Sequence, residues 1–81
     1  MKIVVAGQVY LNPKINEYLV ITKTNQDQVS WRGVGFRGTA VSEVFLEEYQ
    51  PVDPQDLDDA ERKSLVSFYN GELLMGCIEN D

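Results

Sequence analysis

Apolar and polar residues alternate through the first half of the chain with the period of two that is typical of β-strands. Four runs fit strands, at residues 2–10, 17–24, 29–36 and 39–48, although the first is a continuous apolar, β-branched run. Three polar or glycine-containing stretches separate them, at residues 12–14, 24–28 and 37–38. Asn12 precedes a proline, which favours a turn there, and Gly7 predicts a bend in the first run. The pattern therefore predicts four short strands joined by tight turns.

The fourth run fits a strand less well than the others. If residues 39–48 are extended, Phe45 shares a face with Glu43 and Glu47. A large ring among carboxylates needs a bulge or an additional packing partner. Both possibilities remain open on the sequence alone.

After Tyr49 the pattern changes from period two to the period of a helix. Residues 50–53 form an extended connector, and Asp53 followed by Pro54 is a helix start. An apolar stripe follows at Leu57, Ala60, Leu65 and Phe68. Asn70-Gly71 ends the helix, because glycine readily adopts the left-handed cap conformation. We expect a helix over residues 54–70, and a tail or last strand over residues 71–81.

These elements predict one α+β domain over residues 1–81, built mainly from β-structure. A β module of residues 1–49 would form a small antiparallel curled sheet or an SH3-like barrel of about four to five strands. One amphipathic helix follows it, either plugging an open end or lying against an open sheet.

Composition excludes several kinds of chemistry. The chain has no histidine and a single cysteine, Cys77. A zinc site with the usual nitrogen and sulfur ligands and a histidine-based catalytic triad are therefore excluded. No apolar run approaches the ~18 residues that span a bilayer, so we expect no membrane insertion. One thiol and no leader segment lead us to expect a cytoplasmic protein.

No motif indicates an enzyme, a cofactor or a metal site. Residues 33–38 have the spacing G-x-G-x-x-G, but they lie in a β-hairpin and not between a strand and a helix. Asp53, Asp56, Asp58 and Asp59 are clustered, yet they fall where helix caps belong. We therefore expect a protein without catalytic residues and without a bound cofactor.

Charge divides the chain into a basic part and an acidic part. The net charge is −6. Residues 1–42 hold five lysines and arginines and two acids, a net +3, whereas residues 43–81 hold two bases and eleven acids, a net −9. The two parts either neutralise each other in the fold or meet different partners.

One stretch combines large rings with cations and is the first candidate contact surface. Its residues, with two neighbours, are Tyr18, Lys23, Trp31, Arg32, Phe36 and Arg37. Rings that stack on bases and cations that contact phosphates suit RNA or single-stranded nucleic acid, and the same residue types anchor protein interfaces. Adjacent residues on a strand point to opposite faces, so one of Trp31 and Arg32 belongs to the core.

The predicted helix supplies a second candidate surface. Its acids are Asp56, Asp58, Asp59 and Glu61. Carboxylates on a helix can take the place of phosphates against a nucleic-acid-binding partner, although an amphipathic helix normally has a charged outer face in any case.

Several segments together resemble a known group of proteins. Residues 7–10, 18–23, 34–38, 43–47 and 49–54 are similar to the short accessory proteins of large tailed bacteriophages. That resemblance implies a small soluble protein made in an infected bacterium, which binds and modulates or inhibits a host or defence protein without catalysis. An RNA- or single-strand-binding barrel is the alternative, and a homo-oligomer that pairs through an edge strand is a third hypothesis.

Overall fold

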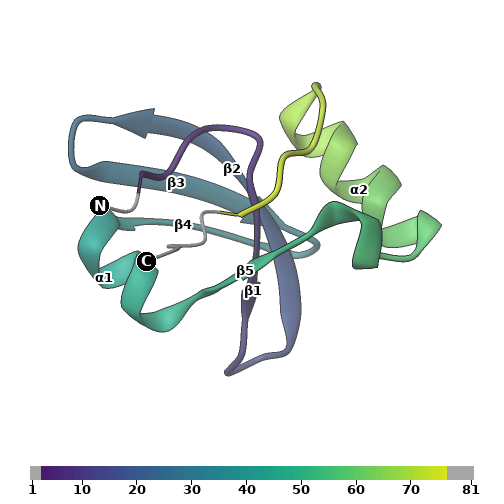
Figure 1. Ribbon diagram of the computed structural model, residues 1–81, viewed down its shortest axis with the longest axis horizontal. Coiled ribbons are helices and arrows are strands. Elements are labelled where there is room, and N and C mark those ends of the chain that lie inside the picture. The colour runs from purple at the N-terminus through teal and green to yellow at the C-terminus, as the bar shows by residue number, and fades with distance from the viewer. Residues whose placement is uncertain (1–2, 77–81) are drawn as a thin grey trace.

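The computed structural model describes residues 3–76 and shows a five-stranded antiparallel curled sheet, with one helix before its last strand and further helical segments after it (Figure 1). The strands are β1 (Val9–Asn12), β2 (Glu17–Asn25), β3 (Gln28–Gly33), β4 (Phe36–Val41) and β5 (Gln50–Val52). The helices are α1 (Ser42–Glu48), the 3₁₀ turn η1 (Pro54–Asp56) and α2 (Asp59–Tyr69). The sheet order is β4-β3-β2-β1-β5. The predicted α+β class with a curled antiparallel sheet is confirmed, and among the described strands β4 and β5 form the two edges.

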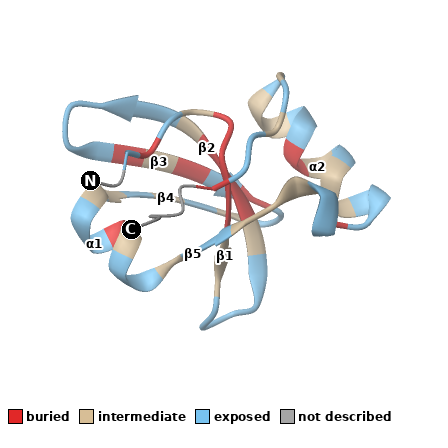
Figure 2. Cartoon of the chain, in the orientation of Figure 1, coloured by how far each residue is buried: buried red, intermediate tan, exposed pale blue. Residues whose placement is uncertain are grey.

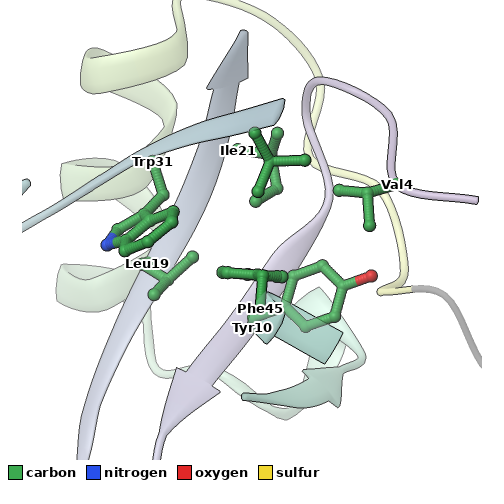
Figure 3. Close-up of a cluster of buried hydrophobic side chains, with 7 residues drawn as sticks. Val4, Tyr10, Leu19, Ile21, Trp31 and Phe45 are labelled. Carbon is green, nitrogen blue, oxygen red and sulfur yellow. The ribbon is translucent and has the colours of Figure 1, made fainter. Parts of the chain in front are cut away.

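Both faces of the sheet are covered, each by a different helix. On the inner face, side chains from β1, β2 and β3 pack with Phe45 of α1 (Figure 3); the buried set is Val4, Tyr10, Leu19, Ile21, Val29, Trp31 and Phe45. On the outer face Val9 and Val20 pack under Leu57 and Leu65. Consecutive residues of a strand therefore enter different clusters, as strand geometry requires. Figure 2 shows that burial is concentrated where the strands and helices meet.

Residues 42–48 form helix α1, and the prediction of a strand there was wrong. Helical spacing turns Phe45 into the inner cluster, where it is fully buried, and leaves Glu43 and Glu47 exposed. The Phe45 ring stacks on Tyr49, with centroids 4.5 Å apart, and meets Tyr10 edge-on at 4.8 Å. A strand would have placed the ring among the acids, so burial of Phe45 favours the helix.

The turns of the sheet differ in place from those predicted. The β3–β4 hairpin turns at Val34-Gly35, where Gly35 has a φ of 85°, and not at Arg37-Gly38, which lies within β4. The polar loop between β2 and β3 is reduced to Gln26 and its neighbour, with Gln26 in the left-handed region at φ 53°. The strands are consequently longer at this end than expected.

The ends of the chain also depart from the predictions. The first strand begins only at Val9, and residues 50–52, predicted as a connector, form β5 against β1. For residues 71–76, predicted as a tail or a last strand, the structure shows a tail with an isolated bridge between Gln8 and Leu74. Cys77 and the rest of the predicted tail beyond residue 76 lie outside the described residues.

The predicted helix over residues 54–70 is divided in two. Asp53 caps η1 by accepting a hydrogen bond from the Gln55 amide at 2.9 Å, and α2 begins after Asp58. Leu57 between them is buried in the outer cluster. Asn70, not the following glycine, takes the left-handed conformation that ends α2, with a φ of 62°. The break lets Leu57 reach the sheet.

The helical assignment of residues 42–48 makes adjacent residues differ in their effect on stability. Phe45→Ala should lower the free energy of unfolding by about 3–5 kcal/mol, because it leaves a cavity between three rings. Val44→Ala, at a position that is 46% exposed, should change it by less than about 0.5 kcal/mol. Urea unfolding followed by tryptophan fluorescence measures both, and equal losses would contradict the helix.

Candidate interaction groove

Trp31, the largest ring of the candidate surface, belongs to the core. It is only 8% exposed, and its ring lies 5.0 Å from that of Phe45 and 5.2 Å from that of Tyr49. Across the hairpin it faces Gly38, where an added Cβ would come within 2.5 Å of the indole. The indole thus packs directly on the β4 backbone, and it does not serve as an exposed anchor.

Because Trp31 faces inward, Arg32 faces outward, and it meets a second arginine there. Arg32 and Arg37 are direct cross-strand partners on β3 and β4, and both are exposed. Among residues 3–76 neither is in an ion pair with a carboxylate; the ion pair observed in that range joins Arg62 to Asp59. Like charges directly opposite each other in a sheet repel. The two guanidiniums therefore present positive charge that the described fold does not neutralise.

Phe68 of α2 borders this pair. The Arg32 guanidinium carbon lies 4.6 Å from the centre of the Phe68 ring, which is a cation–π contact. Phe68 itself is half-buried against the outer cluster. The last turns of α2 therefore form one wall beside the two arginines.

Hydroxyl groups lie next to the two arginines on the same outer face of the sheet. The hydroxyls of Ser30 and Thr39 lie 3.1 Å apart, and the Thr22 hydroxyl donates to the Ser30 carbonyl at 3.4 Å. Together these residues line what we call the arginine groove, a hollow of about 640 Å³ bordered by Thr22, Ser30, Arg32, Arg37, Thr39 and Phe68, with Trp31 and Gly38 beneath. A second hollow of about 340 Å³, next to Phe36 and Gly35, shares both arginines and Phe68.

The other predicted contact residues lie at different distances from the groove. Phe36 borders the second hollow but packs its ring partly into the inner cluster. Lys23 is exposed and pairs across the sheet with Ser30, at an irregularity in β2. Tyr18 packs against the outer cluster beneath α2. The structure thus brings together Arg32, Arg37 and Phe36 and leaves Tyr18 apart.

The acids of the second candidate surface hold the start of α2. Asp58 accepts a hydrogen bond from the Glu61 amide at 2.8 Å, and the Glu61 carboxylate accepts one from the Asp58 amide at 3.2 Å, which is a capping box. Asp59 lies 3.4 Å from Arg62. Asp56 is exposed in η1. Three of the four carboxylates therefore have partners within the fold.

A hollow of opposite charge lies elsewhere on the molecule. It has a volume of about 800 Å³ and lies between the segment at residues 3–5, the β2–β3 turn and α1. Asp27, Glu43 and Glu47 line it together with exposed Ile3 and Val5. The carboxylates that line this hollow are thus on a different surface from the arginine groove, whose lining contains no acid.

The phenol of Tyr49 has a shifted pKa. Burial raises this pKa above its ordinary value of 10.0, and the carboxylate of Glu48 raises it further. The folded state thus favours the neutral phenol, and this contribution to stability is complete below pH 10 and is lost as the pH rises through the raised pKa. Tyr49 stays neutral at physiological pH, as a ring stacked on Phe45 should.

Chemically, the arginine groove suits an anion. Two guanidiniums supply planar arrays of N–H donors, the hydroxyls can donate or accept, and the ring of Phe68 provides an apolar side. The groove offers no histidine, cysteine or carboxylate that could act as a nucleophile or a base.

Sequence reasoning found the arginines but missed Ser30, Thr39 and Phe68. A turn placed at Val34-Gly35 would have paired Arg32 with Arg37 and aligned the two hydroxyls with them. Phe68 was recognised only as part of an apolar stripe, because no local spacing relates it to β3.

Residues 3–76 show neither a metal site nor a helix that spans a membrane. No group of three or more cysteine and carboxylate side chains in this range is placed to hold a metal ion. The helices in this range are all too short or too polar to cross a membrane.

Comparisons with protein-family models, with curated proteins and with solved structures found no match to this chain.

The capping box gives the acids of α2 a measurable structural role. Asp58→Ala should lower the free energy of unfolding by about 0.5–2 kcal/mol, because the Glu61 amide loses its acceptor. Asp56→Ala removes the same charge without removing a side-chain hydrogen bond found in the described residues, and it should change stability by less than about 0.5 kcal/mol. Chemical denaturation compares the two, and equal effects would contradict the capping role.

Proposed function

We propose that this chain is a non-enzymatic binding protein that binds an acidic surface of a partner protein in the arginine groove. The observation that carries the proposal is the cross-strand pair of Arg32 and Arg37, which is exposed and has no carboxylate partner among the described residues. A carboxylate from another molecule would accept hydrogen bonds from both guanidiniums and reduce their repulsion. An anion should therefore bind more favourably at these two arginines than at a surface whose charges are already paired.

The resemblance to bacteriophage accessory proteins suggests which kind of partner the protein would bind. Such a protein would act in the cytoplasm of an infected bacterium, where it would bind a host or defence protein and modulate or inhibit it. Binding alone is sufficient for that role, because occupying a surface of the target blocks its other contacts.

The arginine groove is preferred over the acidic face of α2 for a physical reason. Asp58 and Glu61 already satisfy backbone amides, and Asp59 is paired with Arg62. A cationic partner would compete with those contacts, whereas an anionic partner in the groove would displace no ion pair found in the described residues.

RNA or single-stranded nucleic acid is the second candidate ligand. The observation that favours it is the ring of Phe68 beside two guanidiniums and two hydroxyls, since bases stack on rings while cations contact phosphates. The net charge of −6 opposes it, because the whole molecule then repels a polyanion at long range. We therefore rank nucleic acid below an acidic protein partner as the ligand of the groove.

Reversing one charge in the groove tests the leading proposal. Arg37→Glu should weaken capture of a partner from a nuclease-treated bacterial lysate by about tenfold or more, because a carboxylate there repels the partner's acids. Lys14→Glu makes the same change in net charge on an exposed turn away from the groove and should leave capture unchanged. Quantitative mass spectrometry of the captured proteins gives the comparison.

A folding control accompanies that test. Arg37→Glu replaces a like-charge pair with an opposite-charge pair, so the free energy of unfolding should stay the same or rise by about 0.2–1 kcal/mol. Equal capture by the parent and the stable Arg37→Glu variant would rule out the groove as the interface.

Salt dependence tests the second candidate. If a single strand binds in the groove, the affinity of the protein for a short oligonucleotide should fall as salt rises. For two phosphate contacts the slope of log affinity against log salt is about −1.4, and Arg37→Gln should reduce its magnitude by about 0.7. Fluorescence anisotropy with a labelled oligonucleotide measures both. An oligonucleotide that stays free even at low salt would exclude nucleic acid.

A further inference from the structure

The two edges of the sheet differ in how far they are protected. β5 has only three residues and includes Pro51, which has no N–H to donate, and its Val52 carbonyl accepts a hydrogen bond from the Gly76 amide at 3.2 Å. β4 has six residues, contains no proline, and keeps an uninterrupted register against β3 from one end to the other. Among the described residues, the backbone of residues 36–40 has no hydrogen bond to any segment except β3.

An edge of this kind can accept another strand. A strand at the side of a sheet presents a row of free N–H and C=O groups, which proteins usually protect with proline, a bulge, a short length or a charged side chain. On β4 the charged side chain Arg37 is the only one of these protections. A charged side chain repels strands that carry the same charge and attracts strands that carry the opposite one. Arg37 therefore protects the β4 edge against basic strands and not against acidic ones.

The side chains of β4 specify what would fit beside it. Arg37 continues a row of neighbours on the outer face that runs from Val20 through Arg32. The residue of an added strand opposite Arg37 would extend that row, with its Cβ about 4.5–5.5 Å away. A carboxylate at this position would lie against two guanidiniums. The next position on the same face lies beside Thr39, where a polar side chain fits.

We propose that β4 pairs with an extended acidic segment of the partner protein, which adds a sixth strand and places an aspartate or glutamate opposite Arg37. This inference rests on the proposed function, since both require an anionic partner at the same arginines. It adds that the segment is extended and that hydrogen bonds to the β4 backbone hold it, the mode known as β-augmentation. The arginines would then select an acidic sequence in the partner's segment, while hydrogen bonds to the β4 backbone would supply affinity.

A second copy of this chain suits the edge less well. β4 contains no acidic residue, so two β4 strands side by side would bring another arginine and no carboxylate. The acidic segment is the occupant that the charge of the edge favours.

A designed peptide tests the inference directly. The probe is a capped peptide of about eight residues in which glutamate and valine alternate, long enough to cover β4. In NMR titration we expect amide shifts concentrated in β4 and β3, with slower hydrogen exchange at alternate amides of residues 36–40. A matched peptide with lysine in place of glutamate should not bind. In the Arg37→Glu variant the preference should reverse, with about a tenfold change for each peptide.

Backbone pairing is tested by N-methylation. Two isomers of the glutamate peptide are methylated at one or the other set of alternate amides, and only one set can face β4. One isomer should lose binding and the other should keep it, whereas attraction by charge alone would treat them equally. Sedimentation of the free protein as a dimer would favour the second copy and overturn the inference.

The outcomes separate this inference from the proposed function. If the peptide does not bind, or if both methylated isomers bind equally, the extended segment is rejected, and the proposed function stands as long as capture from the lysate still depends on Arg37. If Arg37→Glu changes neither capture nor peptide binding, both are rejected.

Discussion

Much of this molecule depends on the packing of one indole. Trp31 lies against the rings of Phe45 and Tyr49, which stack on each other, and against the backbone at Gly38. These contacts join β3 to β4 and join both strands to α1, which connects the two edge strands β4 and β5 along the chain. Aromatic rings bury large areas and interact favourably at such separations, so this cluster is a main source of stability in a chain of 81 residues.

The inward position of Trp31 also determines the outer face. On a strand the next residue must point the other way, so Arg32 lies outside, and the register that places Gly38 opposite the indole places Arg37 opposite Arg32. The groove is therefore a product of core packing. Its two arginines remain opposite each other because moving them apart would require the indole to leave Gly38, so packing on the inner face sets the geometry of the candidate groove.

The sequence predicted the α+β class, strands joined by tight turns, and opposite orientations for Trp31 and Arg32, because each depends on local alternation and turn residues. It left open which of the two faces outward. It did not predict α1. The segment at residues 42–48 alternates like a strand over a short span. The helix is favoured because it buries Phe45 against Tyr10 and Trp31, which are far away in the sequence. The sequence also did not predict that Phe68 borders the groove, because this depends on how α2 lies across the sheet. Tertiary contacts of this kind leave no local pattern.

The contact between Arg32 and Phe68 links the groove to the helix that covers the outer face. One guanidinium cannot lie fully on a ring and fully on a bound carboxylate at the same time, so a ligand that draws Arg32 away weakens a contact that helps to hold the end of α2. By thermodynamic reciprocity, any change that loosens α2 would make Arg32 easier to recruit. Occupancy of the groove and the docking of α2 would thus be coupled equilibria, so a ligand bound at Arg32 would change how tightly α2 is held.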